Sequence, residues 1–71
     1  MSLQLTGDRI REVRTQHLKL SQIIMAEALG LTQSSLSAIE QHKVLPSCYF
    51  LYSLHIAYGI NLNWLLTGKG E

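Results

Sequence analysis

The breakers of regular structure are few in this sequence and lie about one short helix apart. Glycine and proline most often end helices and strands, and here Gly7, Gly30, Gly59 and Gly68 with Pro46 divide the chain. Between them, apolar residues recur at spacings of three and four, which is typical of helices. No segment alternates apolar and polar residues as a half-buried strand does. The sequence therefore predicts an all-α fold.

Residues suited to helix ends locate these helices more closely. Ser21, Thr32, Ser47 and Asn61 stand where an N-terminal cap would accept a backbone hydrogen bond, and Gly30 stands where a left-handed C-terminal residue is favoured. We expect five short helices in a compact bundle, forming a single domain over residues 1–71. The predicted helices span residues 6–17, 21–29, 32–41, 47–58 and 61–66.

Helical periodicity also indicates which side chains form the core. The residues expected there are Leu31, Leu36, Ile39, Leu51, Leu54, Leu65 and Leu66, with Trp64 and Cys48. His55 lies on an inward-leaning position, so we expect it to be partly buried and hydrogen-bonded. Neither His42 nor His55 has a carboxylate or cysteine neighbour in the sequence that would suggest chemistry.

Composition excludes several classes of protein. One cysteine rules out an intrachain disulfide, and the three histidines are too widely spaced to form a zinc site with it. The five acidic residues are dispersed, and no nucleophile–base set or phosphate-binding loop is present. We therefore expect no enzyme, cofactor, metal or small-molecule substrate. No apolar run has membrane-spanning length, and "MSLQLTGD" is too short and polar for a signal peptide, which predicts a cytoplasmic protein with no membrane partner.

The balance of charged and apolar residues bears on what the chain contacts. A net charge of +1 neither suggests nor excludes nucleic acid. A hydrophobic fraction of 46% is high for a small domain that needs polar cover. Some apolar surface is therefore expected to meet another molecule.

The most informative stretch is "SQIIMAEALGLTQSSLSAIE", which joins the second and third predicted helices. Two helices at a steep angle, joined by three or four residues that often include glycine, form a helix-turn-helix. Ala26 would allow the two helices to cross closely, Gly30 would form the left-handed turn, and Leu31 would fill the angle between the helices. This spacing predicts a helix-turn-helix over helices 21–29 and 32–41.

From Arg9 to Gly68 the chain resembles the Cro/phage-repressor (Xre, lambda-repressor-like) DNA-binding family. The matching pieces, in order, are "RIREVR", "SQ", "A…LGLTQSSLSAIE", "LPS" and "YGINLNWLLTG". The resemblance implies a five-helix lambda-repressor-like domain that binds double-stranded DNA as a transcriptional regulator, of the prophage-repressor type, with helix 32–41 in the major groove of a palindromic operator. In such repressors more sequence commonly follows, so the chain is expected to be the N-terminal part of a longer repressor.

This chain departs from the family pattern in two ways. It is one residue longer between Arg14 and Ser21. Apolar or aromatic residues also stand where the family usually carries charged ones, at Ile23, Ile24, Tyr49 and Phe50.

The resemblance implies roles for residues at the start of helix 32–41 and around it. Gln33 would read a base, since its amide can pair with adenine N6 and N7, and Ser34, Ser37 and the methyl group of Ala38 would also contact bases. Residues expected to contact phosphates are Gln22, Ser35, Gln41, His42, Lys43 and Arg14. Arg9 and Arg11 would add phosphate contacts only if they face DNA. Without the helix-turn-helix context, we would interpret Ser34, Ser35 and Ser37 as a solvated helix face.

A module with so little charge would bind DNA weakly, which favours a homodimer that reads two half-sites. We expect Tyr49, Phe50 and Ile56, with the end of the fifth helix, to form the symmetric contact; alternatively these apolar residues are scattered singly or repacked. The rival function is a protein-interaction module of the same fold, such as an antitoxin that binds a toxin partner. A restriction-system controller protein, which is a comparably small DNA binder, is a further alternative.

Overall fold

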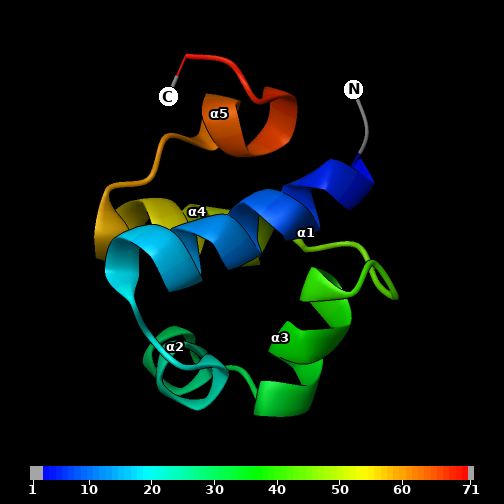
Figure 1. Ribbon diagram of the computed structural model, residues 1–71, viewed down its shortest axis with the longest axis vertical. Helices are drawn as coiled ribbons and strands as arrows, with labels where there is room; N and C mark the ends of the chain where they lie inside the picture. The colour runs from blue at the N-terminus through cyan, green and yellow to red at the C-terminus, as the bar shows by residue number, and fades with distance from the viewer. Residues whose placement is uncertain (1–2, 71) are drawn as a thin grey trace.

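Residues 3–70 form five α-helices and no strand in a computed structural model, which describes the side-chain surroundings of residues 6–70 (Figure 1). The predicted all-α class is confirmed. The elements in chain order are α1 (Leu3–Glu12), the π-helical segment η1 (Val13–Leu18), α2 (Gln22–Leu29), α3 (Gln33–Glu40), α4 (Cys48–Tyr58) and α5 (Leu62–Thr67).

The helices are arranged around α1. Figure 1 shows α1 crossing the middle of the molecule with α4 behind it, α2 and α3 below, and α5 above. α1 packs against α3 and α5, whereas α2 packs against α3 and α4. The pair α2–α3 therefore occupies one end of the bundle, and α5 lies at the opposite end.

One hydrophobic core holds all five helices together. Its buried members are Ile10, Met25, Ala26, Leu36, Ile39, Phe50, Leu51, Leu54 and Leu65. Ala26 of α2 is 1% exposed, and α2 packs against α3. Five of the predicted core residues are confirmed as buried: Leu36, Ile39, Leu51, Leu54 and Leu65. Leu31, Trp64 and Leu66 pack against the core while remaining partly exposed.

The predicted N-terminal caps of α2, α3, α4 and α5 are confirmed. The side chains of Ser21, Thr32 and Ser47 accept hydrogen bonds from backbone N–H groups three residues later, and Asn61 accepts from Asn63 and Trp64. Gly30 ends α2 at φ 77°, a left-handed conformation that glycine adopts without a steric penalty. These caps fix the start of α3, the helix on which the predicted base contacts lie.

The first helix differs most from the prediction. It begins at Leu3 rather than near Thr6, and Gly7, expected to act as a breaker, lies inside it. A Cβ at Gly7 would come within 2.5 Å of the Ile39 carbonyl oxygen. Glycine therefore allows α1 to approach the end of α3.

The extra residue between Arg14 and Ser21 is accommodated by a change in helix type. The chain widens into η1, whose i→i+5 pattern places one more residue in the turn than an α-helix does. The segment closes on Lys19, which is left-handed at φ 56°, and Leu20 N–H donates to the Arg14 carbonyl at 2.9 Å. With the added residue placed in this turn, α2 still packs against α3 and α4.

Three predictions about α4 need correction. Cys48, expected in the core, is exposed. Phe50, expected at a dimer contact, is 3% exposed and belongs to the core. His55 is exposed rather than partly buried, although its Nδ1 does form the expected hydrogen bond, at 2.9 Å to the Ile60 carbonyl. Because Phe50 packs inward, Tyr49 and its neighbours one turn later form the outer face of this helix.

Candidate nucleic-acid interface

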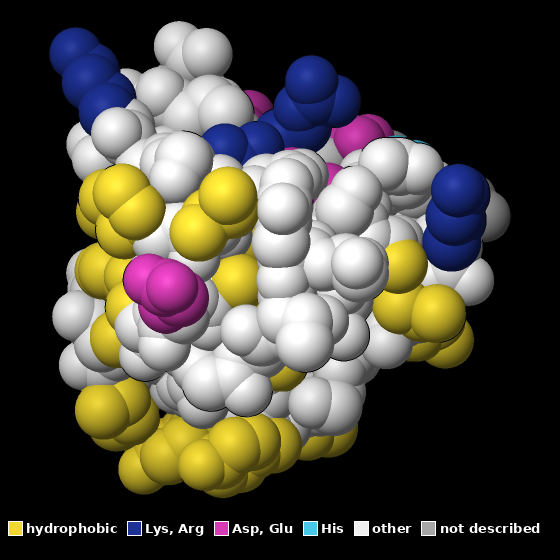
Figure 2. Space-filling model, turned by 90° about the horizontal axis from the view of Figure 1, so that it is seen from below, with side chains coloured by type: hydrophobic (Ala, Val, Ile, Leu, Met, Phe, Trp, Pro, Cys, Tyr) yellow, Lys and Arg dark blue, Asp and Glu magenta, His cyan; other side chains and the backbone are white. Residues whose placement is uncertain are grey.

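The outer face of α3 forms a shallow hollow of about 320 Å³. Its lining consists of Gln33, Ser34, Ser37, Ala38, Gln41 and Lys43. These are the four predicted base-contacting residues and two of the predicted phosphate-contacting residues, so the fold brings them onto one surface. Figure 2 views the molecule from the α2–α3 end and shows mostly uncharged polar atoms at the centre, with Lys and Arg side chains toward the edges.

Short-range hydrogen bonds fix the polar side chains of α3. Thr32 Oγ1 accepts from Ser35 N–H at 3.1 Å and donates to Ser35 Oγ at 3.0 Å. Ser37 Oγ accepts from Gln41 Nε2 at 2.7 Å, which holds Gln41 beside the hollow. Ser35 does not line the hollow, and its hydrogen bonds are those of the helix cap.

Gln33 is held by a glutamine from α2. Gln33 Nε2 donates to Gln22 Oε1 at 3.4 Å, and Gln22 Nε2 donates to Glu40 Oε1 at 3.0 Å. A carboxylate only accepts hydrogen bonds, so Gln22 must turn its N–H side toward Glu40 and its oxygen toward Gln33. Gln33 must then donate one N–H inward. Its Oε1 and second N–H have no partner among the described residues, and Gln33 is exposed.

The chain of amides ends at a buried ion pair. Glu40 accepts from Arg14 Nε at 2.7 Å and from Arg14 Nη2 at 2.9 Å, a bidentate arrangement. The side chains are 10% and 2% exposed. Arg14 Nη1 also donates to the Leu20 carbonyl at 2.9 Å. The pair therefore connects η1 and the turn after it to the end of α3. Glu40 of this pair is also the acceptor for Gln22.

This position corrects the role expected for Arg14. Arg14 is 8% exposed and its guanidinium is bonded inside the protein, so it cannot meet a phosphate in this structure. Arg9 Nη1 likewise donates to the Leu65 carbonyl of α5, at the end of the bundle opposite α3. The concentration of arginines near the N-terminus is largely structural.

The sequence prediction did not assign a role to Glu40. A signal was present, because Glu40 lies four residues after Leu36 and Arg14 lies four residues after Ile10, each on the helix face that carries a core residue. Two opposite charges at core positions of separate helices indicate a buried pair. Only the tertiary structure shows that the two faces meet.

His42 lies at the edge of the interface in an uncommon conformation. It is left-handed at φ 67°, and its Nε2 lies 2.9 Å from Asp8 Oδ1 of α1. The fold thus brings a carboxylate from a distant part of the sequence beside His42, which was not expected from the sequence. Because Asp8 engages the ring, His42 is better described as a link between α1 and the turn carrying Gln41 and Lys43 than as a phosphate contact.

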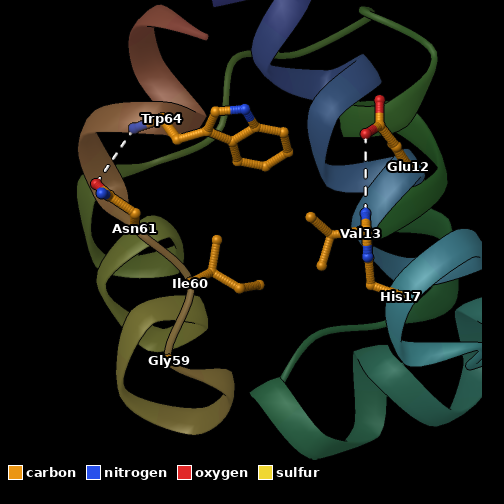
Figure 3. A pocket seen from close by; sticks show the side chains of 7 residues that line it. All are labelled: Glu12, Val13, His17, Gly59, Ile60, Asn61 and Trp64. Atoms are coloured by element: carbon orange, nitrogen blue, oxygen red, sulfur yellow. Dashed lines mark hydrogen bonds and ion pairs between the residues drawn. The ribbon is translucent and has the colours of Figure 1, made fainter. Parts of the chain in front are cut away.

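A second hollow, of about 400 Å³, lies between η1 and the connection from α4 to α5. Figure 3 shows Trp64 and Ile60 on one side, facing Val13, Glu12 and His17 on the other. Glu12 and His17 form a 3.9 Å ion pair and are more than half exposed. A solvated pair on the rim above an apolar wall does not orient a ligand, so the polar face of α3 is the better candidate for function.

The described helices include none that is both long and apolar enough to cross a membrane.

The relation of the chain to known proteins agrees with the helical arrangement. A family model described as a helix-turn-helix domain matches residues 7–71. The chain belongs to the helix-turn-helix domain family. The helix-turn-helix domain is non-enzymatic, in agreement with the expectation from the sequence.

Two curated relatives carry the same domain within longer chains. The chain is 46% identical over 57 residues to the HTH-type transcriptional regulator PuuR of Escherichia coli (strain K12), and equally to that of Shigella flexneri. The matched region covers 80% of this chain and 30% of each relative, so the chain spans less than a third of their length. No solved structure matches the chain.

Proposed function

We propose that this chain is the DNA-binding part of a transcriptional regulator that places α3 in the major groove of double-stranded DNA. The observation that carries the proposal is the hollow on α3, a capped helix. Exposed Gln33 and Ser34 line it at the start of the helix, and half-buried Ser37 and Ala38 line it in the middle. The helix-turn-helix family and the similarity to regulators named HTH-type support it.

The hydrogen bonds of Gln33 suit it to recognise adenine. Bidentate pairing with adenine requires one amide oxygen, which accepts from N6, and one amide N–H, which donates to N7. Gln33 uses only one N–H in its bond to Gln22. Its oxygen and other N–H are then available for a base, provided that the N–H bonded to Gln22 is the one on the side away from the oxygen. Ser34 and Ser37 would add hydrogen bonds, and Ala38 would offer a methyl group to thymine.

Phosphate contacts would come from the edges of this surface. Gln41 and Lys43 line the hollow, and Lys43 is its one charged residue within the described part of the chain. Gln22 lies at the start of α2, where free backbone N–H groups favour a phosphate. Such contacts fix position, while the base edges supply sequence preference.

At the finer level we propose a repressor of the Cro/phage-repressor type, with a prophage-type repressor as the model. Its operator would be palindromic and read by a homodimer, with half-sites about one helical turn apart. The small net charge of +1 favours two linked modules, because phosphate neutralisation provides most of the affinity that does not depend on sequence.

Selection of bound sequences from a random pool of duplex DNA tests this function directly. We expect a palindromic consensus that contains adenine at a fixed position in each half. Gln33→Ala should then lower discrimination at that position by about 1–3 kcal/mol. Gln16→Ala is the matched control, because Gln16 is an exposed glutamine on η1, away from α3. Equal discrimination by the parent and Gln33→Ala would exclude Gln33 as a base reader.

A protein-interaction module, such as an antitoxin that binds a toxin, is the second candidate. The exposure of large apolar side chains on α2 and α4 favours it, including Ile24 at 53% and Tyr49 at 78%. Failure to enrich any DNA sequence in the selection would favour this candidate over DNA binding.

A further inference from the structure

Helix α4 is apolar on two faces, of which the core covers one. Phe50, Leu51 and Leu54 point inward and are buried. Tyr49, Tyr52 and Ile56, at helical spacings of three and four, are 78%, 55% and 63% exposed. No residue of Cys48–Tyr58 is an Asp, Glu, Lys or Arg. A helix that is hydrophobic all round is normally buried all round, so the outer face of α4 is expected to be covered.

This outer face has the shape of a groove with projections. Together with Ala28 and Leu29 of α2 it encloses about 320 Å³. Its lining combines small side chains, those of Ala28, Ser53 and Ala57, with the large ones of Tyr49, Tyr52 and Ile56. Figure 2 shows hydrophobic side chains gathered along the lower edge of the α2–α3 end of the molecule. We call this surface the α2–α4 groove.

We propose that the α2–α4 groove binds the same groove of a second copy of this chain, around a two-fold axis. In such an isologous contact one patch must complement itself. A surface that carries both a hollow and large projecting side chains meets this requirement, because Tyr52 or Ile56 of one copy can enter the hollow of the other. The choice of a second copy as the occupant rests in part on the proposed function, which requires paired modules.

The absence of charged residues from the described lining of the groove is compatible with a second copy and disfavours a charged partner. Among the described residues, no Asp, Glu, Lys or Arg lines it. Residues near a two-fold axis face their own copies, so a charge there would repel itself, and this groove avoids that cost. A charged peptide or a DNA backbone would find no ionic partner in it. The groove shares no lining residue with the hollow on α3, so the two surfaces can be occupied together.

Sedimentation equilibrium of the 71-residue chain without DNA tests the proposal. We expect the mass to rise with concentration toward that of two copies. Ile56→Glu should remain a single copy at concentrations where the parent is paired, because a carboxylate would face its own copy across the axis. Ile23→Glu is the matched control: Ile23 is 52% exposed on α2 but does not line the groove, and this variant should pair like the parent.

Two further measurements separate pairing from folding and from DNA recognition. Circular dichroism should give Ile56→Glu the helical content of the parent, since Ile56 is exposed. Its thermal midpoint should equal the parent's only at concentrations where the parent is also a single copy, because pairing stabilises the folded state. The variant should keep the parent's preference among half-site sequences while losing the added affinity for a full palindrome. A parent that stays a single copy at every concentration, or an Ile56→Glu variant that pairs normally, would overturn the proposal while leaving base reading by α3 intact.

Discussion

The hollow on α3 and the α2–α4 groove have the same volume, about 320 Å³, and opposite chemistry. Amide, hydroxyl and ammonium groups line the first, whereas tyrosine, leucine, isoleucine and alanine dominate the second. Hydrogen-bonding groups in a fixed orientation can distinguish base edges. Burial of an uncharged apolar surface lowers the free energy whatever the DNA sequence is. A small bundle can therefore separate DNA recognition from self-association by placing the first on α3 and the second on α2 and α4.

The two surfaces also differ in what supports them. Gln33 donates a hydrogen bond to Gln22, and Gln22 donates one to Glu40 of the buried Arg14–Glu40 pair. The groove rests on the hydrophobic core beneath α4. Variants that remove one support should therefore damage one surface and spare the other.

The largest effect is expected from Glu40→Ala. This change leaves the Arg14 guanidinium buried without its partner, which should lower the free energy of unfolding by about 3–5 kcal/mol in urea denaturation. The double variant Arg14→Met with Glu40→Leu is the control, because apolar replacement of both partners should restore most of that stability. It should pair like the parent yet discriminate bases poorly, since Gln22 has lost its acceptor. Full discrimination in the double variant would show that the pair does not orient Gln22.

A smaller effect is expected from Gln22→Met, which removes the hydrogen-bond link while keeping a side chain of similar length. Discrimination at the adenine read by Gln33 should fall by about 0.5–1.5 kcal/mol, the value of one hydrogen bond. Titration of matched and mismatched operators, with and without Gln33→Ala, measures the coupling. If Gln22 acts through Gln33, its change should add little once Gln33 is gone. Additive losses would instead indicate an independent contact to DNA.

The smallest effect on specificity is expected from Lys43→Gln. Lys43 lines the hollow as its charged member, so removing its charge should weaken binding to all DNA sequences by the same factor. The slope of log affinity against log salt should become shallower by about 0.9 if Lys43 neutralises one phosphate. Fluorescence titration at several salt concentrations provides both quantities. A change in base preference would place Lys43 among the readers, and self-association should be unaltered in either case.

Much of the interface could be predicted because it depends on neighbours in the sequence. Thr32 caps a helix through the N–H of Ser35, three residues away, and Gly30 supplies a left-handed turn. Once the start of α3 is fixed, helical geometry places Gln33, Ser34, Ser37 and Gln41 on one face. In the structure these four residues line one hollow, while their contacts with DNA stay a prediction.

The errors lie where the sequence offers no contrast between faces. In α4, apolar residues occur all round the helix, so periodicity cannot say which face turns inward. The sequence pattern places Phe50 outside and Cys48 inside, whereas the structure has them reversed. Packing against α2 and α5 makes that choice.

The helical class, the caps and the polar face of α3 follow from the amino-acid sequence alone, because each depends on hydrogen bonds or spacings within a few residues. Three outcomes require the folded chain: Arg14 and Glu40, 26 positions apart, meet in the interior, η1 absorbs the added residue, and α4 leaves Tyr49, Tyr52 and Ile56 outside. These outcomes depend on which helix faces come together, and that is settled by the packing of the whole core.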